Sequence, residues 1–160
     1  MVAALNLDGP GHAPPYLCVS HTFGIHMPVI HTASDKFMVG ERMNIEGPSP
    51  EGTFSAVFED DGDTGYFYAL NRGGSDENPI LNAMHIYNVN NISDKNLESE
   101  VIIAWSEDFL KVVLLINGFP HGVFDFSQKR GWCRTGFPTP NPNSGWMGHE
   151  WDDKALKLFA

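Results

Sequence analysis

The chain has 160 residues, of which 42% are hydrophobic and 19% are charged, and its formal net charge is -10. This length and composition favour one folded domain and exclude an intrinsically disordered chain. No apolar run approaches the roughly 20 residues of a membrane-spanning helix, and the negative charge disfavours nucleic acids and anionic membranes as partners.

Residues 1–26 carry scattered Pro, Gly and His without helix or strand periodicity, so we expect a flexible N-terminal extension. A single α+β domain is expected over residues 27–160. Asp8 is the only charged side chain among the first 34 residues, which gives neither the basic start of a secretory signal nor the arginines of a transit peptide. Cys18 and Cys133 lie far apart and indicate no disulfide framework, so a cytoplasmic location is expected.

Strands are expected from Phe37 onward. The moderately apolar segment 36–45 is followed by the turn sequence GPSPEG at 47–52. Next, residues 53–60 and 65–70 alternate with the period of a strand, which places Tyr66 and Tyr68 on one face and Phe67 and Ala69 on the other. The two segments predict a β-hairpin.

The loop of this hairpin, DDGDTG at 60–65, is rich in acids. If Gly62 is placed at the glycine of a calcium-binding loop, the first ligand position falls on Val57 and the closing glutamate on Tyr68. Neither residue fits, whereas Asp and Gly suit a tight turn. The sequence therefore predicts a solvated turn here and no metal site.

Asn78 and Pro79 have the preferences of a helix start, and a short helix is expected at 79–84. A strand at 85–89 and three strands within 101–126 follow, the latter forming an antiparallel meander. Its first two strands are apolar at consecutive positions, so they should lie in the middle of the sheet. With a short helix closing the chain at 151–159, the fold class is α+β, mainly an antiparallel β-sheet made of a hairpin and a three-stranded meander.

The chain contains no nucleophile elbow, no phosphate-binding glycine loop and no paired-cysteine or HExxH metal pattern. No cofactor is therefore predicted. Reactive residue types gather between 121 and 134, and loops on a rigid scaffold commonly carry function. The catalytic candidates in this stretch are His121, Asp125, Cys133 and Arg134. Ordinary packing of the histidine and the cysteine is the competing interpretation.

Four segments, AVFEDDGDTGYFYAL, NPILNAMHIYNV, VIIAWSEDFLKVVLLINGFPHGVFDF and GWCRTGFP, resemble a small bacterial family catalogued as a domain of unknown function. The resemblance covers roughly residues 37–151. It implies a bacterial, single-domain protein and supplies no activity and no catalytic residue.

Two functions remain open. Residues 51–108 hold twelve acids and two bases, which favours an acidic, non-enzymatic binding module, such as an immunity-type inhibitor that masks a basic toxin; solubility alone is the competing reading. The expected binding residues are Asp60, Asp61, Asp63, Tyr66, Tyr68 and Trp105. The alternative is a small enzyme or ligand-binding protein with a pocket near 121–134. A homodimer formed through an open sheet edge is a further expectation.

Overall fold

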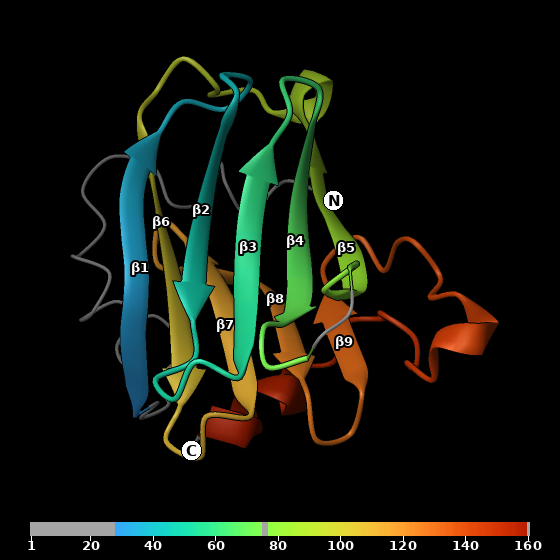
Figure 1. Ribbon diagram of the computed structural model, residues 1–160. Helices are drawn as coiled ribbons and strands as arrows, with labels where there is room; N and C mark the ends of the chain where they lie inside the picture. The colour runs from blue at the N-terminus through green and yellow to red at the C-terminus, as the bar shows by residue number, and fades with distance from the viewer. Residues whose placement is uncertain (1–27, 75–76, 160) are drawn as a thin grey trace.

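The computed structural model describes residues 28–74 and 77–159, which form two antiparallel β-sheets packed face to face (Figure 1). The five-stranded sheet has the order β1-β6-β7-β8-β9, and the four-stranded sheet has the order β2-β3-β4-β5. The strands are β1 (Val29–Phe37), β2 (Met43–Pro48), β3 (Phe54–Asp60), β4 (Thr64–Asn71), β5 (Ile80–Asn88), β6 (Ser99–Ser106), β7 (Lys111–Ile116), β8 (Phe119–Asp125) and β9 (Arg130–Cys133).

The main core lies between the two sheets and follows from the alternation of the strands. Phe58, Phe67 and Met84 point inward from the four-stranded sheet, and Leu114 and Phe124 from the five-stranded one, all fully buried. Phe67 and Phe124 stack across the interface with ring centroids 5.2 Å apart. Burial of each such side chain contributes roughly 1.5–3 kcal/mol, so this layer is the main source of stability.

A second, smaller core covers the outer face of the five-stranded sheet. The 3-10 helix η3 (Asp153–Phe159) packs Leu156 and Phe159 against Val113, Leu115 and other side chains of β6 to β9. Strands β6 and β7 are therefore covered on both faces, which explains why their sequences are continuously apolar. Two further single-turn 3-10 helices are η1 (Val89–Asn91) and η2 (Pro142–Ser144).

The predicted hairpin and meander are confirmed as β3–β4 and β6–β7–β8, and β7 is the central strand of its sheet. The α+β label needs correction, because the described residues are mainly antiparallel β-sheet and their helices are short 3-10 turns. The expected extension at residues 1–26 lies outside the described residues.

The predicted helix at 79–84 is wrong, because these residues begin strand β5. Asn78 does form a local bond, but its Oδ1 accepts from the backbone N–H of Ile80 in a turn that leads into the strand. Asn82, Met84 and Ile86 then point inward at every second position. Pairing with β4 thus outweighs the local helix signal.

The segment 135–150 covers the edges of two neighbouring strands, β5 and β9 (Figure 1). On β5, the N–H of His85 donates to the carbonyl of Phe137, and the Thr135 hydroxyl donates to the carbonyl of His85. On β9, the N–H of Cys133 donates to the carbonyl of His149. This one irregular segment therefore forms hydrogen bonds with backbone groups at the edges of both sheets.

Candidate functional site

The acidic loop between β3 and β4 is a tight turn built from its own carboxylates. Asp60 accepts hydrogen bonds from the N–H groups of Gly40 and Gly62 and from the Tyr87 hydroxyl, and it is only 1% exposed. Asp61 Oδ1 accepts from the N–H groups of Asp63 and Thr64. The predicted turn is confirmed. The expectation that Asp60 binds a partner is corrected, because its carboxylate is buried and holds the turn together.

Tyr66 and Tyr68 lie on the outer face of the four-stranded sheet, half-buried, while Phe67 between them points into the core. Their rings stack with centroids 5.9 Å apart. The Tyr68 hydroxyl donates to Glu59 Oε1 at 2.8 Å across the strand pair. Both rings are therefore held in place on a face that solvent reaches.

The two tyrosines continue into a longer row of rings. Tyr66 meets the His85 ring edge-on at 5.8 Å, and His85 meets the Phe137 ring edge-on at 5.6 Å. Phe137 is 59% exposed, and its position is fixed by the backbone bond from His85 to its carbonyl. We call Tyr68, Tyr66, His85 and Phe137 the aromatic row.

Sequence reasoning missed His85 and Phe137 as members of this site. They come from β5 and from the irregular segment after β9, and no local pattern links them. Phe137 stands in a proline-rich stretch without strand periodicity. Only the backbone bond at the β5 edge brings its ring to the row.

The carboxylate of Asp61 lies near the row and remains ionised at neutral pH. The backbone N–H groups of Asp63 and Thr64 lower the pKa of Asp61. Burial, followed by the hydrogen bond to Glu59, raises the pKa of Tyr68, so its hydroxyl stays protonated and keeps donating. Burial lowers the pKa of His85, which keeps its ring neutral. The outer face of the four-stranded sheet therefore presents aromatic rings with the negative charge of Asp61 near them.

The four catalytic candidates of residues 121–134 do not converge. Cys133 belongs to the core between the sheets, whereas His121 and Arg134 lie on the opposite, outer face of the five-stranded sheet. The Arg134 guanidinium is held over the rings of Phe119, at 4.8 Å, and Trp151, at 3.7 Å. This arrangement gives no shared reaction centre.

His121 is fully buried, and neither of its ring nitrogens has a hydrogen-bond partner among the described residues. Burial lowers the pKa of His121 to about 3, and the nearby Arg134 charge acts in the same direction. The ring is therefore neutral and packed at physiological pH. It lies at the β-bulge where the pairing of β7 and β8 shifts register.

Asp125 and Trp105 have structural roles. Asp125 Oδ1 accepts from the N–H groups of Ser127 and Gln128 and from the Ser127 hydroxyl, which fixes the β8–β9 turn. Trp105 is fully buried between the sheets, and its Nε1–H donates to the carbonyl of Gly47. The expectation that Trp105 anchors a partner is corrected, because solvent does not reach its ring.

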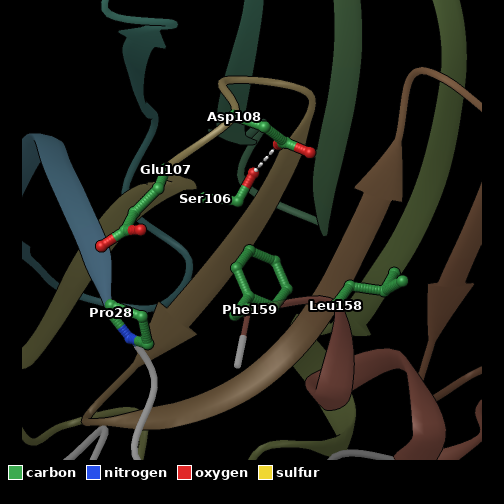
Figure 2. Close-up of a pocket in the computed structure, with 6 residues that line it drawn as sticks. All are labelled: Pro28, Ser106, Glu107, Asp108, Leu158 and Phe159. Atoms are coloured by element: carbon green, nitrogen blue, oxygen red, sulfur yellow. Dashed lines mark hydrogen bonds between the residues drawn. The ribbon is translucent and has the colours of Figure 1, made fainter.

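Two hollows on the described surface bear on ligand binding. One, of about 180 Å³, is lined by Pro28, Leu158, Phe159 and the β6–β7 turn (Figure 2). Its Ser106 hydroxyl already donates to Asp108. The volume is below the roughly 300–1,000 Å³ of small-molecule sites. The other hollow, of about 450 Å³, lies between the ends of the two sheets.

Within residues 28–74 and 77–159, no three or more His, Cys, Asp or Glu side chains are grouped so that they could hold a metal ion. In the same ranges, no helix has the length and apolar character needed to cross a bilayer.

The described residues define an antiparallel two-sheet β-sandwich with an exposed row of aromatic rings on one outer face. The family model "Uncharacterized protein conserved in bacteria (DUF2251)" matches residues 37–160, and the chain belongs to this family. The resemblance inferred from the sequence is thereby confirmed. The chain is also similar to an uncharacterized protein of Haemophilus influenzae, with 41% identity over 106 residues, covering 66% of this chain and 65% of the relative. The match thus spans just under two thirds of that relative. No solved structure matches the chain.

Proposed function

We propose that the protein is a non-enzymatic binding module that holds a basic segment of another protein against the aromatic row. The observation that carries this proposal is the position of Tyr66 and Tyr68, stacked on an accessible sheet face beside the carboxylates of Glu59 and Asp61. An immunity-type inhibitor of a basic toxin is one protein of this kind.

The row is suited to binding because its rings are ordered before a partner arrives. Tyr68 is fixed by Glu59, Tyr66 by stacking, and Phe137 by the backbone bond of its carbonyl to β5. Ordering side chains on binding costs about 0.5–1.5 kcal/mol each, and pre-ordered rings avoid much of this cost. Tyrosine is also among the residue types that contribute most to protein interfaces.

The charge beside the row favours a basic partner. A lysine or arginine side chain that lies over the face of a tyrosine ring gains a cation–π contact, and Asp61 offers an ionised carboxylate nearby. Arg42 also interacts with Asp61, so a partner's cation would compete with it. The twelve acids of residues 51–108 add long-range attraction that speeds association at low salt.

A defined peptide tests this proposal directly. We would titrate the labelled full chain with an arginine-rich peptide and with the same peptide in which each arginine is replaced by glutamate. The expected result is that the basic peptide shifts the amide and side-chain signals of Tyr66, Tyr68, His85 and Phe137, that the shifts weaken with added salt, and that the acidic peptide shifts none. Shifts spread evenly over the acidic surface, without the row, would contradict the proposal.

Two exposed apolar residues give a matched pair of variants. Phe137→Ser removes a ring of the row, and Leu97→Ser removes a side chain of similar exposure, 51% against 59%, in another loop. Loss of the ring should weaken peptide binding by about tenfold, since interface aromatics commonly contribute more than 1 kcal/mol. Leu97→Ser should bind as the unchanged chain does. Equal affinities of the two variants would remove the row from the binding surface, and a change in molecular mass with Phe137→Ser would point to self-association instead.

A further inference from the structure

The hollow of about 450 Å³ lies where the two sheets open at one end of the sandwich. We call it the sandwich cleft. Figure 1 shows the end of β4, the start of β5 and the β8–β9 turn at this same end. The cleft is lined by Phe54, Asn71, Ile80, Leu81, Phe126, Lys129, Ser144 and Trp146. Its volume is within the range of roughly 300–1,000 Å³ that is typical of small-molecule sites.

The walls of the cleft are aromatic and rigid. Phe54 and Phe126 come from opposite sheets and stack with ring centroids 4.4 Å apart. The Trp146 ring stands almost perpendicular to Phe126, at an angle of 86° and a distance of 5.9 Å. Phe126 and Trp146 are both largely buried. Flat stacked and edge-on ring surfaces of this kind are complementary to another flat ring.

The polar side of the cleft is cationic, although the chain as a whole carries a charge of -10. Lys129 is the one charged residue among the eight that line the cleft. Within the described ranges 28–74 and 77–159, no ion pair engages its ammonium group. Asn71 and Ser144 add neutral polar groups to the lining, and no carboxylate lines the cleft. An exposed lysine in such a cavity favours an anionic group on a ligand.

The backbone holds Lys129 at this place. Its φ is 54°, in the left-handed region that a lysine adopts at an energetic cost. Asp125 fixes the turn before it through the N–H groups of Ser127 and Gln128, and the N–H of Met147 donates to the Lys129 carbonyl. The ammonium group is therefore presented from a constrained backbone.

We propose that the sandwich cleft binds a small aromatic carboxylate, with its ring against Phe54, Phe126 and Trp146 and its carboxylate on Lys129. This function would be additional to protein binding at the aromatic row, which lies on the outer face of the four-stranded sheet and shares no residue with the cleft. The sequence predicts, as an alternative, a pocket near residues 121–134. Of that stretch, Phe126 and Lys129 line the cleft, whereas His121, Asp125, Cys133 and Arg134 do not.

Three probes separate the contributions of the ring and the charge. Phenylacetate carries both, phenethylamine carries the ring with the opposite charge, and acetate carries the charge without the ring. Each is titrated into the labelled full chain while the Trp146 indole N–H and the Lys129 amide are observed by NMR. Phenylacetate should give saturable shifts at both sites with a Kd of about 1 mM, as expected of so small a ligand. Acetate and phenethylamine should give none.

Charge variants test the role of the lysine. Lys129→Gln keeps a long side chain at the same strained backbone position and should weaken phenylacetate about tenfold. Lys129→Glu should reverse the preference, so that phenethylamine binds and phenylacetate does not. Lys95→Gln is the matched control, because it removes one exposed positive charge in the loop that follows η1, beyond the far end of β5 from the cleft.

Four results would overturn the proposal. These are no saturable shift with phenylacetate up to about 10 mM, tenfold above the expected Kd; equal binding of phenylacetate and phenethylamine; unchanged affinity of Lys129→Gln; and an equal loss with Lys95→Gln. Because Lys129 is exposed, thermal melts of its variants should match the unchanged chain, which confirms that a loss of binding does not reflect unfolding.

Discussion

The Tyr87 hydroxyl donates to Asp60 Oδ2 at 2.7 Å inside the protein, and this bond fastens the acidic loop to β5. Tyr87 is 1% exposed, as is Asp60, and the same carboxylate also holds the N–H groups of Gly40 and Gly62. The acidic loop at 60–65 is therefore held together by the carboxylate of Asp60, which is almost inaccessible to solvent. Burial, and then the bond to Asp60, raise the pKa of Tyr87, so the hydroxyl remains a donor at any ordinary pH.

Replacement of this buried hydroxyl should be costly. Tyr87→Phe leaves Asp60 Oδ2 with one partner fewer, and we expect the free energy of unfolding to fall by roughly 1–3 kcal/mol in urea denaturation. Tyr68→Phe is the control, since it removes a hydroxyl bound to the half-buried Glu59 and should cost about 1 kcal/mol or less. If both variants lost the same free energy of unfolding, the buried bond to Asp60 would contribute no more stability than the half-buried bond to Glu59.

The buried His121 predicts a pH dependence of stability. The pKa of His121 is about 3 in the folded chain against 6.5 for the free side chain, so the unfolded chain binds more protons between these values. The free energy of unfolding should therefore fall as the pH is lowered from 6.5, by about 2 kcal/mol at pH 5 from this group alone.

His121→Leu isolates that contribution from the other histidines. The variant also removes two ring nitrogens that have no partner among the described residues, so it should gain stability relative to the unchanged chain, and gain more at pH 5 than at pH 8. Chemical denaturation at the two pH values measures both differences. A stability difference that does not change with pH would contradict the neutral, buried state of the ring.

Gly47 lies where β2 packs against β6 of the other sheet. A Cβ atom built there would lie 2.6 Å from Ile103 Cγ2, so Gly47→Ala should lower the free energy of unfolding by roughly 1–3 kcal/mol through overpacking. Gly148→Ala is the control, because its nearest atom is a Glu150 carboxylate oxygen at 3.6 Å. Ile103→Ala removes Cγ2 but keeps Cβ, which lies 2.8 Å from the same built atom, so in this background the cost of Gly47→Ala should shrink only in part. An unchanged cost would show that the contact with Ile103 Cγ2 is not a source of the strain.

Cys133 should be unreactive in the folded protein. Its thiol is fully buried, near the Thr135 hydroxyl and the Phe137 carbonyl. In a Cys18→Ser background, alkylation by iodoacetamide should be at least about 100-fold slower in native buffer than in urea, because the thiol reacts only after the structure opens. Stoichiometric labelling of the folded chain, followed by mass spectrometry, would restore Cys133 as a candidate nucleophile.

Local alternation made the β3–β4 hairpin and the β6–β8 meander predictable, because each pairs strands that are neighbours in sequence. The sequence predicts a moderately apolar strand in segment 36–45. In the structure the chain leaves the five-stranded sheet after Phe37 and enters the other sheet at Met43. Gly40, with a φ of 92°, marks a turn between them, but a turn signal does not show that the next strand joins another sheet.

The parts of the site that the sequence missed depend on contacts between distant residues. Tyr66 and Tyr68 followed from the strand period, but their extension to Phe137 requires a backbone bond between His85 and residue 137. The expectation that Trp105 binds a partner requires an exposed ring, whereas the ring is fully buried. Trp105 is buried because a second sheet packs on that face of β6. The periodicity of the sequence does not show which face of a strand a second sheet covers.

The segment 135–150 has a consequence for synthesis of the chain. It supplies hydrogen bonds that cover the edges of β5 and β9, yet it follows the nine strands of the described ranges in the order of translation. While it is still inside the ribosome, both sheets can form, but two unprotected edges face outward and can pair with another nascent chain. Until this segment has docked, the edges of β5 and β9 are sites at which the newly made chain can pair with a wrong strand.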